Sequence, residues 1–435
     1  MKVQISLIPP ALVTDRIVET AFCGLYNESS EPHCFDVELS LFQGGVRQVV
    51  GRDSKVVGAH GRKRLRIDFP TAGFEGRYSV VAEWRAGEHY GKSALDLEIR
   101  PSTVRSTERI GGAWAGLVHW SEEEGRLWND DIRKLTDNDW RGIVRAMADC
   151  QIDILVIQEL FRNQAYVGGH RIEEEGYAGR AFYPSRLYPL RADLRAENAL
   201  EAILDEADRL GVKVLPGIGL YAWFDFTEGS LAWHKRVASE VHELYGFHPS
   251  FYGWYVSEEV FGNLGETLER KKQLVDFFRG FQRHVQSIAP EKPVMLAPNC
   301  HGLLDSQGFY DELLPNLDIV CPFGFHRMPE GDLAGEQAAE CLQTACDRHG
   351  THLWLDMEAF LFGPDNELYP RPIDDLIDDM KRFPNFEKIL IYQFPGLMSS
   401  PSMRVKLGGE AAVRLYQDYS SWLQAKHSKT WSKAH

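Results

Sequence analysis

The stretch that decides the fold is Phe251-Tyr252-Gly253-Trp254-Tyr255-Val256-Ser257-Glu258-Glu259-Val260. It is almost continuously apolar up to Ser257, which is typical of a strand that is buried on both faces in a parallel sheet. It ends in two carboxylates, which are costly in an interior unless they are solvated, paired or used in chemistry. A similar run, His352-Leu353-Trp354-Leu355-Asp356-Met357-Glu358, follows later in the chain. The two runs predict acidic strand ends within one parallel sheet.

Eight apolar runs of this kind alternate with amphipathic segments. The predicted strands cover residues 113–120, 152–160, 212–220, 252–259, 294–300, 319–325, 353–358 and 389–394. The predicted helices cover residues 140–150, 193–210, 231–245, 264–288, 336–349, 373–382 and 410–425. Alternating strands and helices favour an α/β fold of parallel βαβ units, and eight units suit a (β/α)8 TIM barrel. An open doubly wound sheet is the alternative, but no glycine-rich phosphate loop follows the first strand.

The first hundred residues have a different pattern. Runs such as Phe35-Asp36-Val37-Glu38-Leu39 alternate apolar and polar residues, which indicates strands with one buried face. About seven such strands, separated by glycine-rich turns, favour a small antiparallel, immunoglobulin-like β-sandwich. We therefore predict a β-sandwich domain at residues 1–104 and a barrel domain at residues 105–435. A packing or spacer role is expected for the sandwich, with direct sugar binding as the alternative.

Composition limits the partners of the protein. The 435-residue chain carries a net charge of −15, which disfavours nucleic acid and anionic membranes as partners. No apolar run approaches the roughly 20 residues of a membrane-spanning helix, and the N-terminus lacks the apolar region of a signal peptide. Seven scattered cysteines favour reduced thiols. These features predict a cytoplasmic location unless a leader was removed, and they leave the oligomeric state undetermined.

The carboxyl ends of barrel strands form one rim, which is where active sites lie in this fold. That rim would present carboxylates, imidazoles, amides and large aromatic rings: His119, Trp120, Glu159, Tyr221, Trp223, Glu258, Glu259, Asn299, His301, His326, Asp356, Glu358, Tyr392 and Gln393. Aromatic faces can cover the C–H surface of a sugar, while carboxylates and amides bind its hydroxyl groups. The rim therefore predicts a carbohydrate substrate.

Side-chain alternation along the two acidic strands restricts which groups can meet. Tyr255, Ser257 and Glu259 share one direction and Glu258 takes the other, whereas Asp356 and Glu358 point the same way. Alternation alone does not decide which set faces the barrel interior. Glycoside cleavage needs two carboxyl groups, one as acid and one as nucleophile or base, and strands four and seven face each other across the barrel mouth.

The run 253–259 resembles the strand-four motif of the clan A glycoside hydrolase barrels, and the run 353–358 resembles their strand-seven motif. The resemblance implies Glu259 as acid/base, Glu358 as nucleophile and retention of anomeric configuration. Glu258 stands where an asparagine that binds the sugar 2-hydroxyl is usual, so it is expected to contact sugar or to be an alternative acid. Residues of about 110–400 are also similar to a little-characterised, glycosyl-hydrolase-like barrel family, a domain of unknown function. That similarity rests on Tyr183-Pro184-Ser185 and on the Gly-Trp-Tyr start of the fourth strand.

Two other functions remain open at this point. A metal-dependent sugar isomerase or aldolase-type barrel could bring Glu159, Glu259, His301, His326 and Glu358 to one divalent ion, although no His-x-His spacing marks a ligand set. A non-catalytic carbohydrate-binding protein is the third possibility. The favoured prediction is a glycoside hydrolase that uses no metal and no cofactor.

Overall fold

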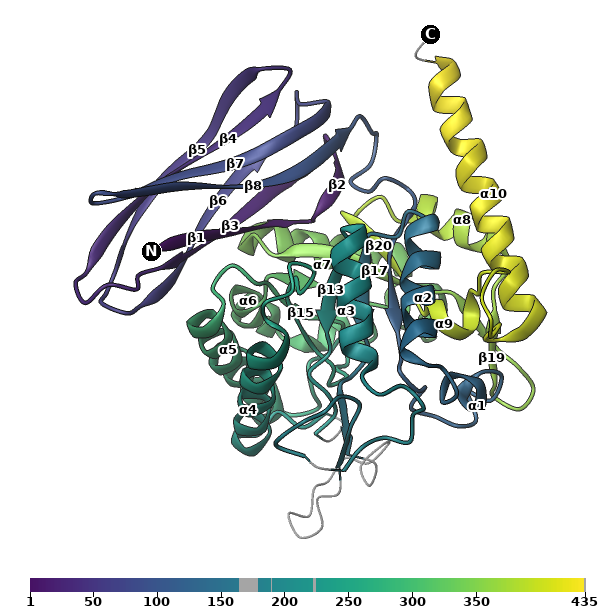
Figure 1. Ribbon diagram of the computed structural model, residues 1–435. Coiled ribbons are helices and arrows are strands. Elements are labelled where there is room, and N and C mark those ends of the chain that lie inside the picture. Colours follow the sequence, from purple (N-terminus) through teal and green to yellow (C-terminus); the bar gives the residue numbers. More distant parts are fainter. Residues whose placement is uncertain (164–178, 189, 222–223, 434–435) are drawn as a thin grey trace.

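The computed structural model describes residues 1–163, 179–188, 190–221 and 224–433 (Figure 1). Two sheets form the N-terminal part. One contains β1 (Lys2–Ile8), β3 (Val18–Tyr26) and β6 (Arg62–Pro70), and the other contains β2 (Ala11–Thr14), β8 (His89–Arg100), β7 (Gly76–Ala86), β4 (His33–Gln43) and β5 (Val46–Val57). Their strands pair antiparallel except for the parallel pair β2–β8.

The predicted alternation of buried and exposed residues is confirmed in β6, where Leu65, Ile67 and Phe69 are buried and their neighbours are not. These side chains join one hydrophobic cluster with residues of the second sheet, such as Phe35 and Ile99. The immunoglobulin-like assignment and the boundary at residue 104 stay predictions.

A second part of the chain forms a nearly closed parallel barrel. Its eight strands are β9 (Ile110–Ala115), β10 (Ile154–Ile157), β13 (Lys213–Pro216), β14 (Trp254–Val256), β15 (Val294–Leu296), β16 (Ile319–Val320), β17 (His352–Glu358) and β20 (Lys388–Tyr392). Isolated parallel bridges, Val214–Phe251 and Gly217–Tyr255, join the two edge strands β13 and β14. All eight predicted strands are present in the predicted order. Most end earlier than predicted, because the apolar runs continue into the loops of the rim.

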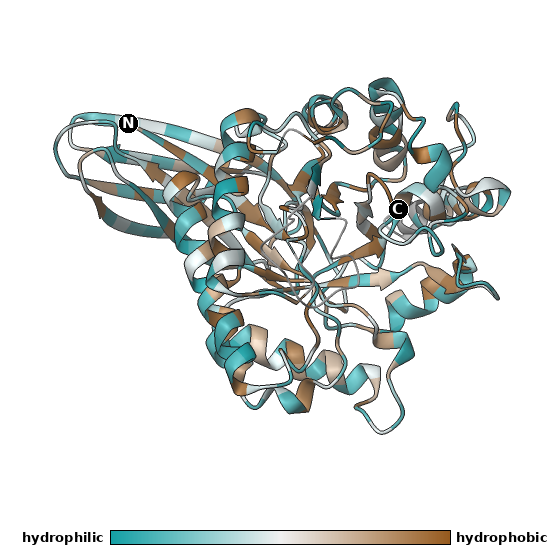
Figure 2. Ribbon diagram, turned by 90° about the horizontal axis from the view of Figure 1, so that it is seen from below, coloured by the Kyte–Doolittle hydropathy of each residue, from teal (hydrophilic) through white to brown (hydrophobic). Residues whose placement is uncertain are grey.

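Helices surround the barrel, as Figure 1 shows. They are α2 (Asp137–Asp149), α3 (Ala199–Leu210), α4 (Glu228–Tyr245), α5 (Leu268–Ile288), α7 (Gly335–His349), α8 (Ile373–Arg382) and α10 (Gly409–Lys433), with the short helices α1 (Asn129–Ile132), α6 (Phe309–Leu313) and α9 (Phe394–Leu397). Figure 2 shows hydrophobic residues along the central strands, while the outer helices carry many hydrophilic residues.

Local signals explain several helix ends. Thr136 caps α2 through a capping box with Asp139, and Gly211 ends α3 in the left-handed conformation with φ of 73°. The start of α3 was predicted six residues too early, because Asn198 is the residue that caps its first turn. The helix α10 continues to Lys433, beyond residue 425, where the predicted helix ends. In the described part of the chain, no helix is both long and apolar enough to cross a membrane.

The barrel interior is filled by one cluster to which every strand contributes, as TIM-type barrels require. Its members from the eight strands include Trp114, Ile154, Leu215, Tyr255, Met295, Ile319, Trp354 and Leu390. Ile8 and Phe22 of the first N-terminal sheet join the same cluster. The Tyr252 hydroxyl also donates to the Leu7 carbonyl at 2.7 Å. The N-terminal sheet therefore closes the amino ends of the strands and leaves the opposite rim for a site.

Candidate active site

A cavity of about 210 Å³ lies at the carboxyl ends of the barrel strands. Its lining includes residues from the ends of all eight strands: Trp114, Trp120, Glu124, Gln158, Glu159, Leu220, Tyr255, Ser257, Glu259, Ala297, Phe323, Arg327, Asp356, Glu358, Phe360, Phe362, Leu368 and Tyr392. Three of them come from the hairpin of β18 (Phe360–Phe362) and β19 (Leu368–Pro370), which follows β17. Carboxylates and aromatic rings therefore line one cavity.

Glu358 lies at the end of β17 and is almost completely buried. Arg327, from the turn after β16, places Nε 2.8 Å and a terminal nitrogen 2.6 Å from Oε1 of Glu358, and His326 Nδ1 lies 2.9 Å from Oε2. Burial disfavours the ionised carboxylate, but the contacts with His326 and Arg327 outweigh it and lower the pKa of Glu358. Glu358 is thus held as an anion inside the cavity.

Glu259 follows β14 and lines the same cavity from another strand end. The side chain is half-buried, and burial raises its pKa above that of a free glutamate, with the charge of Arg327 acting in the opposite sense. Tyr255 and Ser257 line the cavity with it, as side-chain alternation requires. The two cavity carboxyls at the ends of β14 and β17 therefore have pKa values shifted in opposite directions.

Glu124 is a third cavity acid, and sequence reasoning missed it. It lies in the loop after β9, and its backbone carbonyl accepts a 2.9 Å hydrogen bond from Leu368 of β19. Burial raises its pKa to about 7, and the carboxylates of Glu123 and Glu259 add to the effect. In the sequence it ends the run Glu122-Glu123-Glu124, which looks like an ordinary solvated acidic segment.

Comparisons with known proteins place this barrel in a family. Residues 110–404 match the family described as a domain of unknown function, DUF4434. The chain belongs to the DUF4434 family. No curated protein sequence matches the chain.

Solved structures resemble the DUF4434 barrel more widely. A proposed alpha-L-fucosidase from Bacteroides thetaiotaomicron is 17% identical, with a TM-score of 0.53 over 74% of this chain and 96% of that chain. A beta-glucuronidase from Bacteroides uniformis is 13% identical, with a TM-score of 0.41 over 96% of this chain and 49% of that chain. At such identities the likeness to the first structure concerns the fold alone.

Asp356 and Glu159 are further acids in the DUF4434 cavity. Burial and the neighbouring charge of Glu358 raise the pKa of Asp356 well above its ordinary value, and its Oδ1 has no hydrogen-bond partner. Glu159 pairs with the guanidinium of Arg162, which also donates to the Val118 carbonyl at 2.7 Å. The cavity therefore holds one paired acid and one acid whose pKa is raised by burial.

Glu258 points away from the cavity of the DUF4434 barrel. Its Oε1 accepts a 2.6 Å hydrogen bond from the backbone N–H of Tyr221, and His234 of α4 lies 3.9 Å away. The side chain is 1% exposed and is not among the cavity-lining residues. The structure thus places Glu258, predicted as a sugar contact, between the strand end and the helix layer.

Other predicted contacts also lie beside the cavity rather than in its lining. They are His119, Tyr221, Asn299, His301, His326 and Gln393. The Asn299 side chain accepts from the backbone N–H groups of Gly262 and His301, and that of Gln393 accepts from Gly116. Burial lowers the pKa of His119 to about 4, so this imidazole is neutral. Trp223 lies outside the described residues.

Arg327 was also missed, although the adjacent His326 was predicted. Sequence alone offers no sign that this arginine reaches across to Glu358, because the turn Phe325–Arg327 decides its direction. The five residues of the metal-enzyme alternative, Glu159, Glu259, His301, His326 and Glu358, do not gather as metal-holding groups among the described residues.

Proposed function

We propose that the protein is a glycoside hydrolase that cleaves a glycosidic bond with Glu259 and Glu358. The observation that carries this proposal is that both carboxyls line one cavity while their surroundings shift their pKa values in opposite directions. A glycosidase needs this division, because one carboxyl must donate a proton and the other must be an anion.

Glu358 is suited to attack. It is ionised by its contacts with Arg327 and His326, and it lines the cavity from the end of β17. In the first step, a Glu358 oxygen forms a bond to the anomeric carbon as the bond from that carbon to the leaving oxygen breaks. Glu358 loses its negative charge when it becomes bonded to carbon. Arg327 orients the carboxylate for this attack and lowers its basicity.

Glu259 is suited to proton transfer. Its raised pKa favours the protonated form, and that proton passes to the leaving oxygen as the glycosidic bond breaks. The resulting Glu259 carboxylate then removes a proton from water, whose oxygen displaces Glu358 from the anomeric carbon. Two displacements at one carbon give a product with retained configuration.

The rest of the cavity is suited to a sugar ring. Trp120, Phe360 and Tyr392 supply apolar faces, and Gln158 and Asp356 supply polar groups at the same lining. Aromatic walls with a few polar groups are typical of small-molecule sites. The fold shared with a proposed alpha-L-fucosidase supports this reaction class only at the level of the fold, and the sugar stays open.

The test is turnover of a panel of aryl glycosides by the wild-type protein and by Glu358→Gln. We expect at least one glycoside to be cleaved, and the variant to lose about 10³-fold or more in kcat with an unchanged circular dichroism spectrum. Glu340→Gln, which changes an exposed glutamate on α7, is the matched control and should keep full activity. Equal turnover by wild type and Glu358→Gln would overturn the proposal, and binding without turnover would favour a non-catalytic carbohydrate-binding protein.

A further inference from the structure

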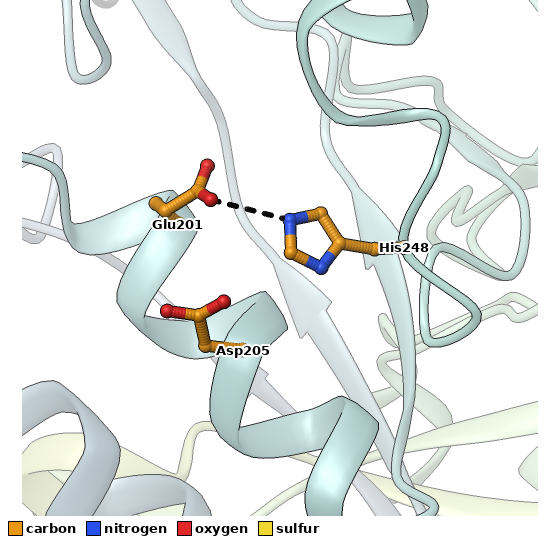
Figure 3. Close-up of side chains that lie close together, drawn as sticks. All are labelled: Glu201, Asp205 and His248. Carbon is orange, nitrogen blue, oxygen red and sulfur yellow. Dashed lines mark ion pairs between the residues drawn. The ribbon is translucent and has the colours of Figure 1, made fainter.

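Three potential metal ligands lie together on the outside of the barrel, away from the cavity carboxylates. Glu201 and Asp205 are four residues apart on one face of α3, and His248 approaches them from the turn that precedes β14 (Figure 3). One ligand atom from each residue lies within 4.8 Å of the other two. Nε2 of His248 is 3.5 Å from Oε1 of Glu201.

The histidine gives an observation that is independent of the two acids. His248 is only 4% exposed, and its Nε2 has no hydrogen-bond partner although it is buried. Its Nδ1 lies 2.7 Å from Oδ2 of Asp208, so Nδ1 carries the proton that this carboxylate accepts. With the proton on Nδ1, Nε2 carries a lone pair, and Figure 3 shows this nitrogen facing Glu201, with Asp205 further along α3.

Asp208 is itself held in place. Its Oδ1 accepts a 2.7 Å hydrogen bond from the backbone N–H of Ser250, two residues beyond the histidine. A carboxylate that orients a histidine from behind is the usual support of a metal-binding imidazole, because it fixes the tautomer and raises the basicity of the free nitrogen. The arrangement Asp208–His248 therefore has the form of a ligand with its supporting group.

We propose that Glu201, Asp205 and His248 bind one divalent transition-metal ion. An imidazole nitrogen with two carboxylate oxygens suits zinc and its neighbours, whereas calcium prefers six to eight oxygen ligands. Arg141 donates a 2.9 Å hydrogen bond to Oδ2 of Asp205, so Oδ1 of Asp205 stays available to the ion. Three carboxylates, Glu201, Asp205 and Asp208, stand against two cations, Arg141 at Asp205 and Lys213 at Asp208, so the cluster keeps an excess of negative charge that suits a divalent cation.

The position of the cluster indicates a structural role. The helix α3 leads directly into β13, and His248 lies just before β14, so the ion would join the segments that precede the two edge strands of the barrel. Among the described residues, isolated bridges and backbone hydrogen bonds such as Val214 N–H to the Ser250 carbonyl connect these strands in place of a continuous ladder. The metal thus links the segments that precede β13 and β14, and β14 is the strand that leads to Glu259. This inference does not depend on the proposed reaction.

Calorimetric titration of chelator-treated protein with zinc chloride tests the site. We expect wild type to bind one equivalent, and the double variant Glu201→Gln/Asp205→Asn to bind at least tenfold more weakly. Both substitutions keep side-chain size at partly exposed positions, so the fold should persist even where His248→Gln fails to fold. Glu340→Gln removes an exposed helical glutamate elsewhere and should bind as wild type does.

Thermal unfolding gives a second measurement on the same proteins. Because a ligand that binds only the folded state stabilises it, excess zinc should raise the Tm of wild type and of Glu340→Gln but not of the double variant. No binding by wild type would overturn the proposal. Equal affinity of wild type and the double variant would also overturn it, because the ion would then be held elsewhere.

Discussion

Replacing Arg327 by methionine removes the cation that holds Glu358 ionised while keeping much of the apolar side-chain volume. Arg327 places two nitrogens within 2.8 Å of Oε1 of Glu358. A hydrogen bond to a charged group contributes about 1.5–3 kcal/mol, and the side chain of Arg327 is 41% exposed, which weakens the interaction. We therefore expect about 1–2 kcal/mol to be lost in the stabilisation of the anion, equivalent to roughly five- to thirtyfold in an equilibrium.

The assay is the pH profile of kcat/KM on an aryl glycoside that the wild-type protein cleaves. Loss of the cation raises the pKa of Glu358, so the ionised form is populated only at higher pH and the acidic limb of the profile moves to higher pH. Arg327→Lys keeps the charge but loses the paired contact, and it should lie between wild type and Arg327→Met. Arg382→Met removes an arginine that pairs with Glu336 on the outer helices and should leave the profile unchanged. An acidic limb that stays in place, or moves downward, in Arg327→Met would refute the reasoning.

Three further predictions follow from the same geometry. Glu259→Gln should slow the cleavage of glycosides with poor leaving groups by about 10²–10⁴-fold, and that of activated aryl glycosides much less, because only poor leaving groups need a proton from Glu259. Rates for a series of glycosides with different leaving groups will measure this. The same Glu259→Gln change removes a negative charge that raises the pKa of Glu124, so the pKa of Glu124 should fall below about 7, as NMR titration of the glutamate carboxyls will measure; an unchanged value would contradict this coupling. Gly211→Ala should cost about 1 kcal/mol in urea unfolding, since φ is 73° and no atom lies within 4 Å of the added methyl group, so the cost is backbone strain alone.

The barrel could be predicted because its strands are buried on both faces, and such strands appear in the sequence as continuous apolar runs. Alternation along β14 correctly grouped Tyr255, Ser257 and Glu259, and the structure adds that this group faces the cavity while Glu258 does not. The carboxyl ends of the strands were harder to predict from the sequence. The apolar residues of 321–325 read as strand, but β16 stops at Val320 and the rest forms the rim.

The missed cavity groups share a physical cause. Glu124 belongs to an acidic run whose neighbours are exposed, and only the loop after β9 and the contact with Leu368 bring it to the cavity. Arg327 depends on the geometry of a single turn. The cluster of Glu201, Asp205 and His248 joins two acids of one helix to a histidine more than forty positions later. Only the folded structure brings them together.

The measurement that tests the central claim most directly is mass spectrometry of a trapped intermediate. The wild-type protein is incubated with the 2-deoxy-2-fluoro analogue of a glycoside that it cleaves, carrying an activated leaving group, and is then digested. The account predicts the mass of one fluorosugar on the peptide that contains Glu358, and no label in Glu358→Gln. Label on another carboxylate, or continued turnover of the parent glycoside with no covalent adduct, would contradict it.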